Sequence, residues 1–385
     1  MVIDRGLASL PDRLPATHRA WIEVKLSAIR RNLLAIRRLL TPSTLLMSVV
    51  KADGYGHGAE AVARTALSAG ASWLAVATLE EGIQLRRAEI EAPVLLFCPA
   101  ISKEEVEAIA LHRLQPTVCN LDQARRFSEA GLPGMRLHLK VDTGMSRLGA
   151  PAHEVRDLLG ALGELSNVII AGLYSHLATA DAPDPMMARQ QLRQFAELVE
   201  TLNARQVRPP LVHLANSAAT LGDPGTHFDL VRVGLAQYGF YPAPHLRSVV
   251  PLQPALAVKA RIVFVKAVPT GTGISYGHTF RTRRPTRLAT VAIGYADGVP
   301  RALSNRIDLL VRGRRVPQVG TITMDQCLID VTDVPETIEG DITTLLGQDG
   351  PQSIYADEWA GAMGTIPYEI LSAFSRRLPR IYRQD

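Results

Sequence analysis

Residues 46–58 read LMSVVKADGYGHG, and this stretch sets the pattern for the chain before residue 250. Its apolar beginning has the length and composition of a buried β-strand. Lys51 stands at the end of that strand, and three glycines then form a turn in which a bound molecule can approach the backbone closely. The stretch predicts a strand whose carboxyl end presents a lysine to a ligand. A lysine that simply leaves the core for solvent is the competing interpretation.

The segments on either side alternate between helix and strand. Residues 26–40 (LSAIRRNLLAIRRLL) carry apolar side chains at steps of three and four, which predicts an amphipathic helix. Eight apolar runs of strand length occur, including the one in the opening stretch: 46–51, 73–78, 93–98, 115–119, 135–142, 168–176, 211–217 and 229–234. Eight strands separated by helix-compatible segments predict an α/β fold, a closed (β/α)₈ barrel of the TIM type. An open doubly wound sheet is the alternative.

The pattern changes after about residue 250. Residues 255–268, 287–295, 306–313 and 325–331 alternate or run apolar between Gly and Pro turns, without amphipathic helices between them. This pattern of strand-like runs predicts a second, mainly β domain. We therefore expect two domains, a barrel over residues 17–250 and a β-rich domain over residues 251–385.

Composition narrows the class of protein. Hydrophobic residues make up 47% of the chain and charged residues 21%, as in soluble globular proteins. The charged, proline-containing start and the lack of a long apolar run predict a cytoplasmic protein without a membrane partner. The net charge of +5 is dispersed, and its densest cluster, at 281–287, is expected to be a solvated loop rather than a nucleic-acid site. Cys98, Cys119 and Cys327 lack metal-ligand spacing, which predicts reduced, buried thiols and no metal site.

Polar residues gather where the predicted strands end. They are Lys51, Lys140, His176, Ser217, Arg232, Gly234 and Leu235. In a barrel of this type catalytic groups lie at the carboxyl ends of the strands, and the loops after strands seven and eight often bind phosphate. A lysine desolvated there has a lowered pKa and can attack a carbonyl group. Tyr55, in the glycine-rich turn, can donate to a phosphate oxygen.

Three of these positions have structural alternatives. Arg232 stands among β-branched residues and needs a partner, either Asp229 or another carboxylate, or a ring atom of a ligand. Lys140 and Arg147 flank a glycine turn, where an anion or a modified lysine would relieve their repulsion, unless both are solvated loop charges. His176 suits stacking on a flat ring or a hydrogen-bonded place in the core.

Nine motifs then occur in a fixed order: SVVKADGYGHG, LKVDTGMSRLG, HLATAD, NSAA, VRVGLAQYG, SYG, GYADG, TMDQ and PYE. In this order they closely resemble the alanine racemase family, from about Thr17 to Tyr382. The resemblance implies pyridoxal 5'-phosphate as cofactor and a barrel followed by a β-domain. It also implies a homodimer in which the β-domain of one subunit completes the active site of the other.

The resemblance assigns the cofactor contacts. Lys51 becomes the lysine that joins the cofactor's aldehyde, which accounts for an amine at this strand end. The phosphate contacts are Tyr55, Ser217, Gly234, Leu235 and Tyr368. His176 would pack on the pyridine ring, and Arg232 would face its nitrogen.

It also assigns the groups that act on substrate. Lys51 would transfer a proton on one face of Cα, and Tyr276 of the other subunit would transfer a proton on the opposite face. From the sequence alone, Tyr276 is a strand-end aromatic residue. Arg147, which also belongs to the cofactor environment, and the main chain of Met324 would bind the substrate carboxylate. Lys140 resembles a position that is carbamylated in many members, which would orient Arg147.

The substrate-access path shows one departure from the family. Asp181 and Arg301 match its positions, but Thr321 stands where many members carry arginine, so the charge of the entrance differs. The implied reaction is the interconversion of L- and D-alanine, which supplies D-alanine for peptidoglycan. The alternatives are a racemase of broad specificity, a decarboxylase of basic amino acids on a similar barrel, and a pyridoxal phosphate carrier, which would end without the β-domain.

Overall fold

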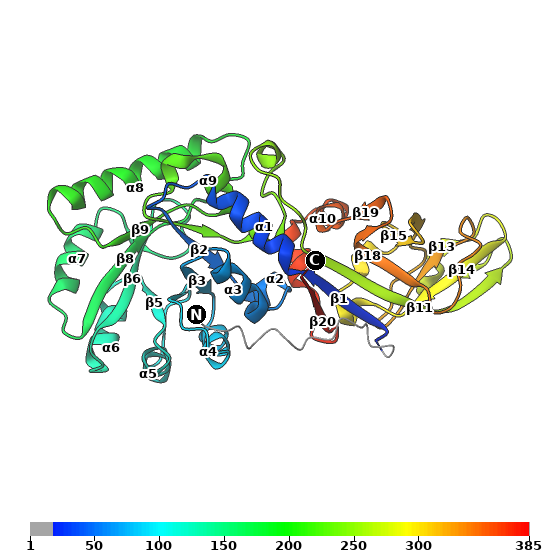
Figure 1. Cartoon of the computed structure of the whole chain (residues 1–385), viewed down its shortest axis with the longest axis horizontal. Coiled ribbons are helices and arrows are strands. Elements are labelled where there is room, and N and C mark those ends of the chain that lie inside the picture. The colour runs from blue at the N-terminus through cyan, green and yellow to red at the C-terminus, as the bar shows by residue number, and fades with distance from the viewer. Residues whose placement is uncertain (1–17, 385) are drawn as a thin grey trace. The chain divides into compact units, whose positions relative to one another are not determined.

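The computed structural model describes residues 18–384, which form two compact units (Figure 1). The barrel unit comprises Ala28–Tyr55 and Ala59–Gln253. The β-rich unit comprises the described residues up to Ser27, Gly56–Gly58, and the chain from Pro254 onward. Each unit is described by itself.

The barrel unit is built on parallel strands. They are β2 (Leu45–Val49), β3 (Trp73–Val76), β4 (Val94–Leu96), β5 (Gln115–Val118), β6 (Met135–Asp142), β8 (Val168–Tyr174), β9 (Leu211–His213) and β10 (Leu230–Val233). The sheet order is β10-β2-β3-β4-β5-β6-β8-β9, and the short β7 (Ala150–Pro151) pairs with β6. Hydrogen bonds from the Asp229 nitrogen to the Val212 oxygen (3.0 Å) and from the Arg232 nitrogen to the Ala215 oxygen (3.0 Å) join β10 to the segment of β9.

This order confirms the predicted barrel and shows that the open-sheet alternative is wrong. The strands follow one another around the sheet in chain order, and its two ends meet, so the sheet is nearly closed. Each of the eight strands lies within, or within one residue of, an apolar run identified in the sequence. Their carboxyl ends therefore share one face, where Lys51 and its polar companions were expected.

Helices alternate with these strands, and Figure 1 shows them around the sheet. They are α1 (Leu26–Arg37), α3 (Ala59–Ser68), α4 (Leu79–Arg87), α5 (Lys103–Leu111), α6 (Leu121–Glu129), α7 (Val155–Gly163), α8 (Met186–Ala204) and α9 (Ser217–Gly222). Two of these helices begin with a capping box: Thr78 pairs with Glu81 at α4, and Ser102 pairs with Glu105 at α5.

The second unit is mainly β. Its large sheet contains β1 (Ala20–Lys25), β11 (Leu256–Val268), β14 (Thr286–Val291), β15 (Asp308–Val311), β16 (Arg314–Pro317), β17 (Cys327–Asp330), β18 (Ile342–Asp349), β19 (Gln352–Ile354) and β20 (Arg380–Arg383). A small sheet pairs β12 (Gly273–Ile274) with β13 (Phe280–Arg281), and α10 (Ala356–Met363) and α11 (Pro367–Ser372) complete the unit. The four strands expected after residue 250 are present.

The start of the chain differs from the expected domain division. The barrel was expected to begin at residue 17, but β1 pairs antiparallel with β11 and parallel with β20. Trp21, Ile22 and Val24 are fully buried in this arrangement. The segment therefore belongs to the β-rich unit, because its ladder partners lie there. The two units divide at Gln253–Pro254, close to the expected boundary.

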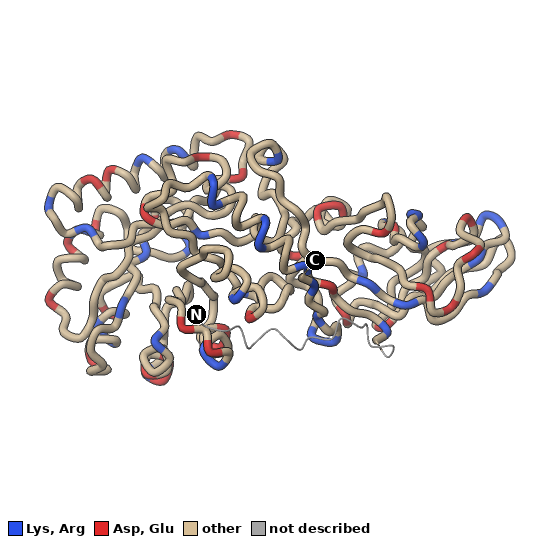
Figure 2. The backbone as a smooth tube through the Cα atoms, in the orientation of Figure 1, with Lys and Arg blue, Asp and Glu red and all other residues tan. Residues whose placement is uncertain are grey.

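The thiols and surface charges are distributed over both units. Cys327 is buried, Cys119 is partly buried and Cys98 is exposed, so the expectation of buried thiols was wrong for Cys98, which lies beyond the end of β4. Figure 2 shows basic residues interspersed with acidic ones along the chain. Among the described residues no helix is long and apolar enough to span a membrane, and no group of His, Cys, Asp and Glu could hold a metal ion.

Candidate active site

Lys51 opens an unusual turn directly after β2. Over α2 (Lys51–Tyr55) the backbone is left-handed, with φ of 52° at Ala52, 52° at Asp53 and 54° at Tyr55. An L-residue in this conformation costs roughly 1–2 kcal/mol, so a run of them persists only where surrounding contacts hold it. Strained backbone conformations of this kind are frequent at functional sites.

Two carboxylates hold the turn. One oxygen of Glu81 accepts from the Ala52 nitrogen at 2.5 Å, and its other oxygen accepts from the Ala77 nitrogen at 2.8 Å. Asp53 accepts from the Ala59 nitrogen at 3.0 Å. Glu81 thus joins the lysine turn to the start of α4, and this connection positions Lys51.

The surroundings of Lys51 favour its neutral amine. Burial lowers the pKa of Lys51, and the positive charge of Arg147 lowers it further, whereas Glu81 and Cys98 act in the opposite direction. The ammonium nitrogen lies 5.8 Å from the centre of the Phe97 ring. A larger fraction of this amine is therefore unprotonated than for a lysine in solvent, as nucleophilic or base chemistry requires.

Backbone and hydroxyl groups converge near the ends of β2, β9 and β10. The Ser217 hydroxyl oxygen accepts from the Gly234 nitrogen at 2.9 Å and from the Ala236 nitrogen at 3.3 Å. A Cβ atom at Gly234 would lie 2.7 Å from the hydroxyl of Tyr55, which is 6% exposed, and Leu235 is buried beside it. The predicted phosphate contacts of the barrel unit thus lie together, and a larger residue at 234 would require the Tyr55 hydroxyl to move.

Arg232 lies at the centre of a buried hydrogen-bond network. Its guanidinium donates to the main-chain oxygens of Ser175 (2.8 Å) and Leu214 (2.9 Å). It also donates to Nδ1 of His213 (3.0 Å) and Nδ1 of His176 (3.2 Å). Burial lowers the pKa of Arg232 to about 10, so the group still carries its charge at neutral pH.

The alternative ion pair between Arg232 and Asp229 is wrong. Asp229 instead pairs with Arg208 and accepts from the Val212 nitrogen at 2.6 Å. The Asp229 carboxylate therefore stabilises the loop before β10, and among the described residues no ion pair joins Arg232 to an acid. A buried guanidinium held by neutral groups keeps its charge available to a ligand.

His176 and Lys140 complete the set in the barrel unit. His176 accepts from Arg232, and burial, followed by the charge of Arg232, lowers the pKa of His176 to about 3. Lys140 is 6% exposed, and its nitrogen lies 5.6 Å from the centre of the Tyr174 ring. Burial first, then Arg147 and Arg232, lower the pKa of Lys140 to about 8. Arg147 itself is exposed.

The remaining predicted residues belong to a loop of the barrel unit and to the β-rich unit. Asp181 is exposed in the loop before α8. The β-rich unit carries Tyr276 (73% exposed), Met324 (52% exposed), Arg301 at the surface and Tyr368 in α11. Thr321 is also in this unit but is 4% exposed, so its side chain lies in the interior.

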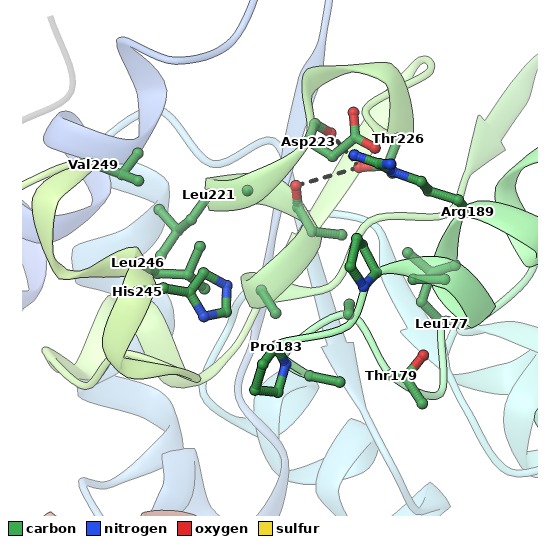
Figure 3. Close-up of a pocket in the computed structure, with 17 residues that line it drawn as sticks. Leu177, Thr179, Pro183, Arg189, Leu221, Asp223, Thr226, His245, Leu246 and Val249 are labelled. Carbon is green, nitrogen blue, oxygen red and sulfur yellow. Dashed lines mark hydrogen bonds between the residues drawn. The ribbon is translucent and has the colours of Figure 1, made fainter.

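A cavity of about 540 Å³ lies beside the loop that contains Asp181 (Figure 3). Its wall includes Leu177, Leu221 and Leu246, with Arg189 and His245 among the polar lining groups. Among the described residues that line it, none is a predicted cofactor contact. The cavity is thus distinct from the cluster around Arg232.

Several residues of this site were missed from the sequence. Glu81 gave a signal only as the third residue of a capping box. His213 and His138 stand within apolar runs, where a histidine resembles an ordinary core residue. Gln237 and Tyr238 both donate to the Val49 oxygen, at 2.8 and 3.0 Å, and so fix the strand end before Lys51. Their place within VRVGLAQYG was the available clue.

Comparison with known proteins gives the same assignment along nearly the whole chain. Residues 24–242 match the family model described as alanine racemase, N-terminal domain, and residues 255–382 match alanine racemase, C-terminal domain. Alanine racemases of Nostoc and Synechocystis are each 50% identical, over 95% and 94% of this chain and 96% and 98% of their own length.

Solved structures show the same fold. The crystal structure of alanine racemase from Bacillus anthracis with bound L-Ala-P has 38% identity, covers 97% of both chains and superposes with a TM-score of 0.90. The biosynthetic alanine racemase of Pseudomonas aeruginosa has 35% identity and a TM-score of 0.85, over 96% of this chain and 100% of its own. The fold and these matches define a two-domain racemase, an isomerase built on a nearly closed parallel barrel. The chain belongs to the alanine racemase family.

Proposed function

We propose that this protein interconverts L- and D-alanine with pyridoxal 5'-phosphate, using Lys51 and Tyr276 as the two proton-transfer groups. The observation that carries the proposal is the half-buried Lys51, with its lowered pKa, on a strained turn in the barrel unit that also holds Arg232 and Ser217. Relatives of known name that match almost the full length are alanine racemases, which supports alanine as substrate.

The groups present fit this cofactor. A phosphate would be bound by Tyr55, Ser217 and the main chain at Gly234, where a Cβ atom would fill the space. Arg232 would donate to the pyridine nitrogen, and His176 would pack on the ring. When bound, the cofactor withdraws electrons from Cα of the attached amino acid and makes its proton more acidic.

The identity of Arg232 limits the reaction. A guanidinium has only donors and retains its proton, so it would hold the pyridine nitrogen without protonating it. The electron withdrawal is then weaker than beside an acid, which disfavours side reactions such as transamination. This leaves more of the catalysis to the proton-transfer groups of the protein.

Those groups must lie on opposite faces of Cα. The Lys51 nitrogen would exchange the proton on one face, and the Tyr276 hydroxyl of a second copy of the chain would exchange it on the other. The exposure of Tyr276, at 73%, leaves this side chain accessible for such a shared site. A tyrosine of unperturbed pKa near 10 needs nearby positive charge to act as a base at neutral pH.

Other residues would hold the substrate. Arg147, which is exposed, and the main chain of Met324 would bind the carboxylate. A carbamate on Lys140 would turn a cation into an anion and orient Arg147. Asp181 and Arg301 would line the access path, whereas the buried Thr321 would contribute no charge there.

The product would be D-alanine for peptidoglycan. The cytoplasmic location expected from the sequence stays a prediction. A racemase of broad specificity is the nearest alternative, because the chain's relatives fix the family more closely than they fix the size of the substrate pocket.

The test is inversion with solvent exchange at Cα, followed in heavy water for the purified protein with added pyridoxal 5'-phosphate. The substrates are alanine and a panel of other L-amino acids. Inversion largely confined to alanine is the expected result. Inversion of many amino acids would favour the broad racemase, release of carbon dioxide a decarboxylase, and cofactor binding without exchange a carrier.

A further inference from the structure

A row of side chains runs from Arg232 through the interior of the barrel unit to the start of β5. Arg232 donates to Nδ1 of His213 at 3.0 Å, and Nε2 of His213 lies 3.1 Å from Nδ1 of His138. Nε2 of His138 lies 3.2 Å from the side-chain oxygen of Gln115. These four residues come from four strands, β10, β9, β6 and β5, and are here called the imidazole row.

Arg232 determines the direction of every hydrogen bond in the imidazole row. A guanidinium can only donate, so Nδ1 of His213 must accept and carries no proton. A neutral His213 therefore has its proton on Nε2 and donates it to Nδ1 of His138. His138 in turn has its proton on Nε2 and donates it to the oxygen of Gln115. One tautomer of each histidine satisfies the whole row.

The backbone leaves space for this row. β8 lies between β6 and β9, and its Gly172 is the ladder neighbour of His138. A Cβ atom at Gly172 would lie only 2.2 Å from Nδ1 of His138, so the two imidazoles meet because this residue has no side chain. Trp73 packs at 70° to the His138 ring, and Tyr174 stacks on His213 with ring centres 4.7 Å apart.

Both imidazoles are held neutral by their surroundings. His138 and His213 are 0% exposed. Burial, then the charges of Arg136 and Arg232, lowers the pKa of His138 to about 3. Burial, then Arg232 and His138, lowers the pKa of His213 well below its usual range. The row ends on the neutral amide oxygen of Gln115, so neither histidine is stabilised in its charged form. A carboxylate in place of Gln115 would instead favour a protonated histidine.

We propose that His138 and Gln115 are positioning residues of the active site, which hold His213 in its Nε2–H tautomer so that its Nδ1 anchors the guanidinium of Arg232. The inference rests on the proposed function in one respect, that Arg232 faces the pyridine nitrogen. Neither His138 nor Gln115 touches the reacting atoms. Their effect passes through the hydrogen bond from Arg232 to His213.

Loss of the Gln115 acceptor has a specific consequence. His138 no longer gains a hydrogen bond from its Nε2 proton, and its Nδ1–H tautomer becomes competitive. That tautomer requires His213 to accept through Nε2 and to carry its own proton on Nδ1. The Nδ1 proton of His213 then faces a donor of Arg232, and the anchor of the guanidinium is lost.

The first experiment reads the tautomers directly. The chain is labelled with ¹⁵N-histidine, and long-range ¹H–¹⁵N correlation identifies the protonated nitrogen of each ring, with and without added pyridoxal 5'-phosphate. The ten histidines of the chain are assigned through single substitutions. The expected result is Nε2–H for both His213 and His138. An Nδ1 proton on His213 would overturn the proposal, whether or not the protein racemises alanine.

The second experiment changes two residues that hold His138 in place, Gln115 and Gly172. Gln115→Leu removes the acceptor at similar volume, and Gly172→Ala displaces the His138 ring. Each is expected to shift the tautomers and to lower kcat between about ten- and a hundredfold, with KM for alanine changed less than about threefold. Gly160→Ala is the matched control, because a Cβ atom at Gly160 meets nothing within 4 Å. It is expected to leave tautomers and kcat unchanged.

The outcomes separate this inference from the proposed function. A wild-type chain that neither binds the cofactor nor inverts alanine would refute the proposed function, while its tautomers still decide how the imidazole row is arranged. Racemisation at the wild-type kcat by folded Gln115→Leu or Gly172→Ala would overturn the positioning role. If Gln115→Leu does not fold, the wild-type tautomers and Gly172→Ala decide the question.

Discussion

The hydroxyl of Thr321 donates to the main-chain oxygen of Tyr276 at 2.8 Å. The main-chain oxygen of Thr321 in turn accepts from the Ser275 hydroxyl at 2.6 Å. The turn between them has φ of 60° at Ser275 and 71° at Gly277, so it depends on such contacts to keep its shape. In this chain, residue 321 thus holds the segment that carries Tyr276.

Thr321→Val keeps the shape of the side chain and removes its donor. We expect about 1 kcal/mol of lost stability and a lower kcat for racemisation, because the Tyr276 segment loses its hydrogen bond. Thr321→Ser retains the hydroxyl and is expected to remain close to wild type. Kinetics and thermal unfolding of both variants check this. A Val variant with the wild-type kcat would show that the contact does not position Tyr276.

Tyr276→Phe tests the second proton-transfer group. The variant is expected to bind pyridoxal 5'-phosphate normally and to lose at least about a hundredfold in inversion, since an acid–base group is removed. One enantiomer should still exchange its Cα proton with heavy water, through Lys51. Tyr355→Phe, in the same unit, is the control. Full inversion by Tyr276→Phe would remove Tyr276 from the mechanism.

Glu81→Gln tests the electrostatics around Lys51. The Glu81 carboxylate raises the pKa of Lys51 against burial, so its loss is expected to lower that pKa further. The rate of amine labelling at Lys51, followed by peptide mass spectrometry against pH in the cofactor-free protein, should then rise at a lower pH than in wild type.

The neighbouring Glu80 provides the control for this measurement. Glu80 is exposed, and Glu80→Gln is expected to leave the labelling midpoint unchanged. A midpoint that moves to higher pH in Glu81→Gln, or moves equally in both variants, would contradict the role given to Glu81.

The strands of the barrel could be predicted because each is an apolar run bounded by helix-compatible sequence. β1 could not, since its ladder partners β11 and β20 lie more than 200 residues further along the chain and local pattern does not record such pairing. Lys51 was visible for a similar local reason: it stands at the end of an apolar strand and before a glycine-rich turn.

The imidazole row was not predictable in the same way. Each of His138 and His213 alone resembles a satisfied core histidine, and 75 residues separate them. Their contact depends on Gly172 in the strand between them, whose missing side chain matters only once the strand order is known. The direction of the hydrogen bonds then follows from Arg232, which can only donate. This direction cannot be seen from one segment, because the four residues come from four strands.

Lys140 is expected to be carbamylated in a pH-dependent manner. Carbon dioxide reacts with the unprotonated amine, and a pKa of about 8 means that this form becomes the majority as pH rises through 8. At a fixed carbon dioxide pressure, ¹³C NMR with labelled carbon dioxide should show a carbamate signal that increases through this pH. Lys140→Gln should abolish the signal. A plain amine at Lys140 across the range would rule out the modification.

Asp297 in the GYADG motif is expected to act on stability. Its carboxylate is fully buried, accepts from Arg19 at 2.6 and 3.0 Å, and also accepts from the Gly294 nitrogen at 3.0 Å. Asp297→Ala removes the acceptor of these donors, so that Arg19 retains only its bond to the Ala292 oxygen (2.6 Å), and is expected to cost about 3 kcal/mol in the free energy of unfolding.

Urea unfolding of the full chain checks this prediction against an exposed ion pair. Asp333 bonds Arg284 at the surface, with side chains 79% and 52% exposed, so Asp333→Ala is expected to leave stability almost unchanged. Asp297→Asn retains the shape and one acceptor oxygen but no charge, and its stability should fall between wild type and Asp297→Ala. Equal stability of Asp297→Ala and Asp333→Ala would mean that the pairing of Arg19 with Asp297 does not stabilise the β-rich unit.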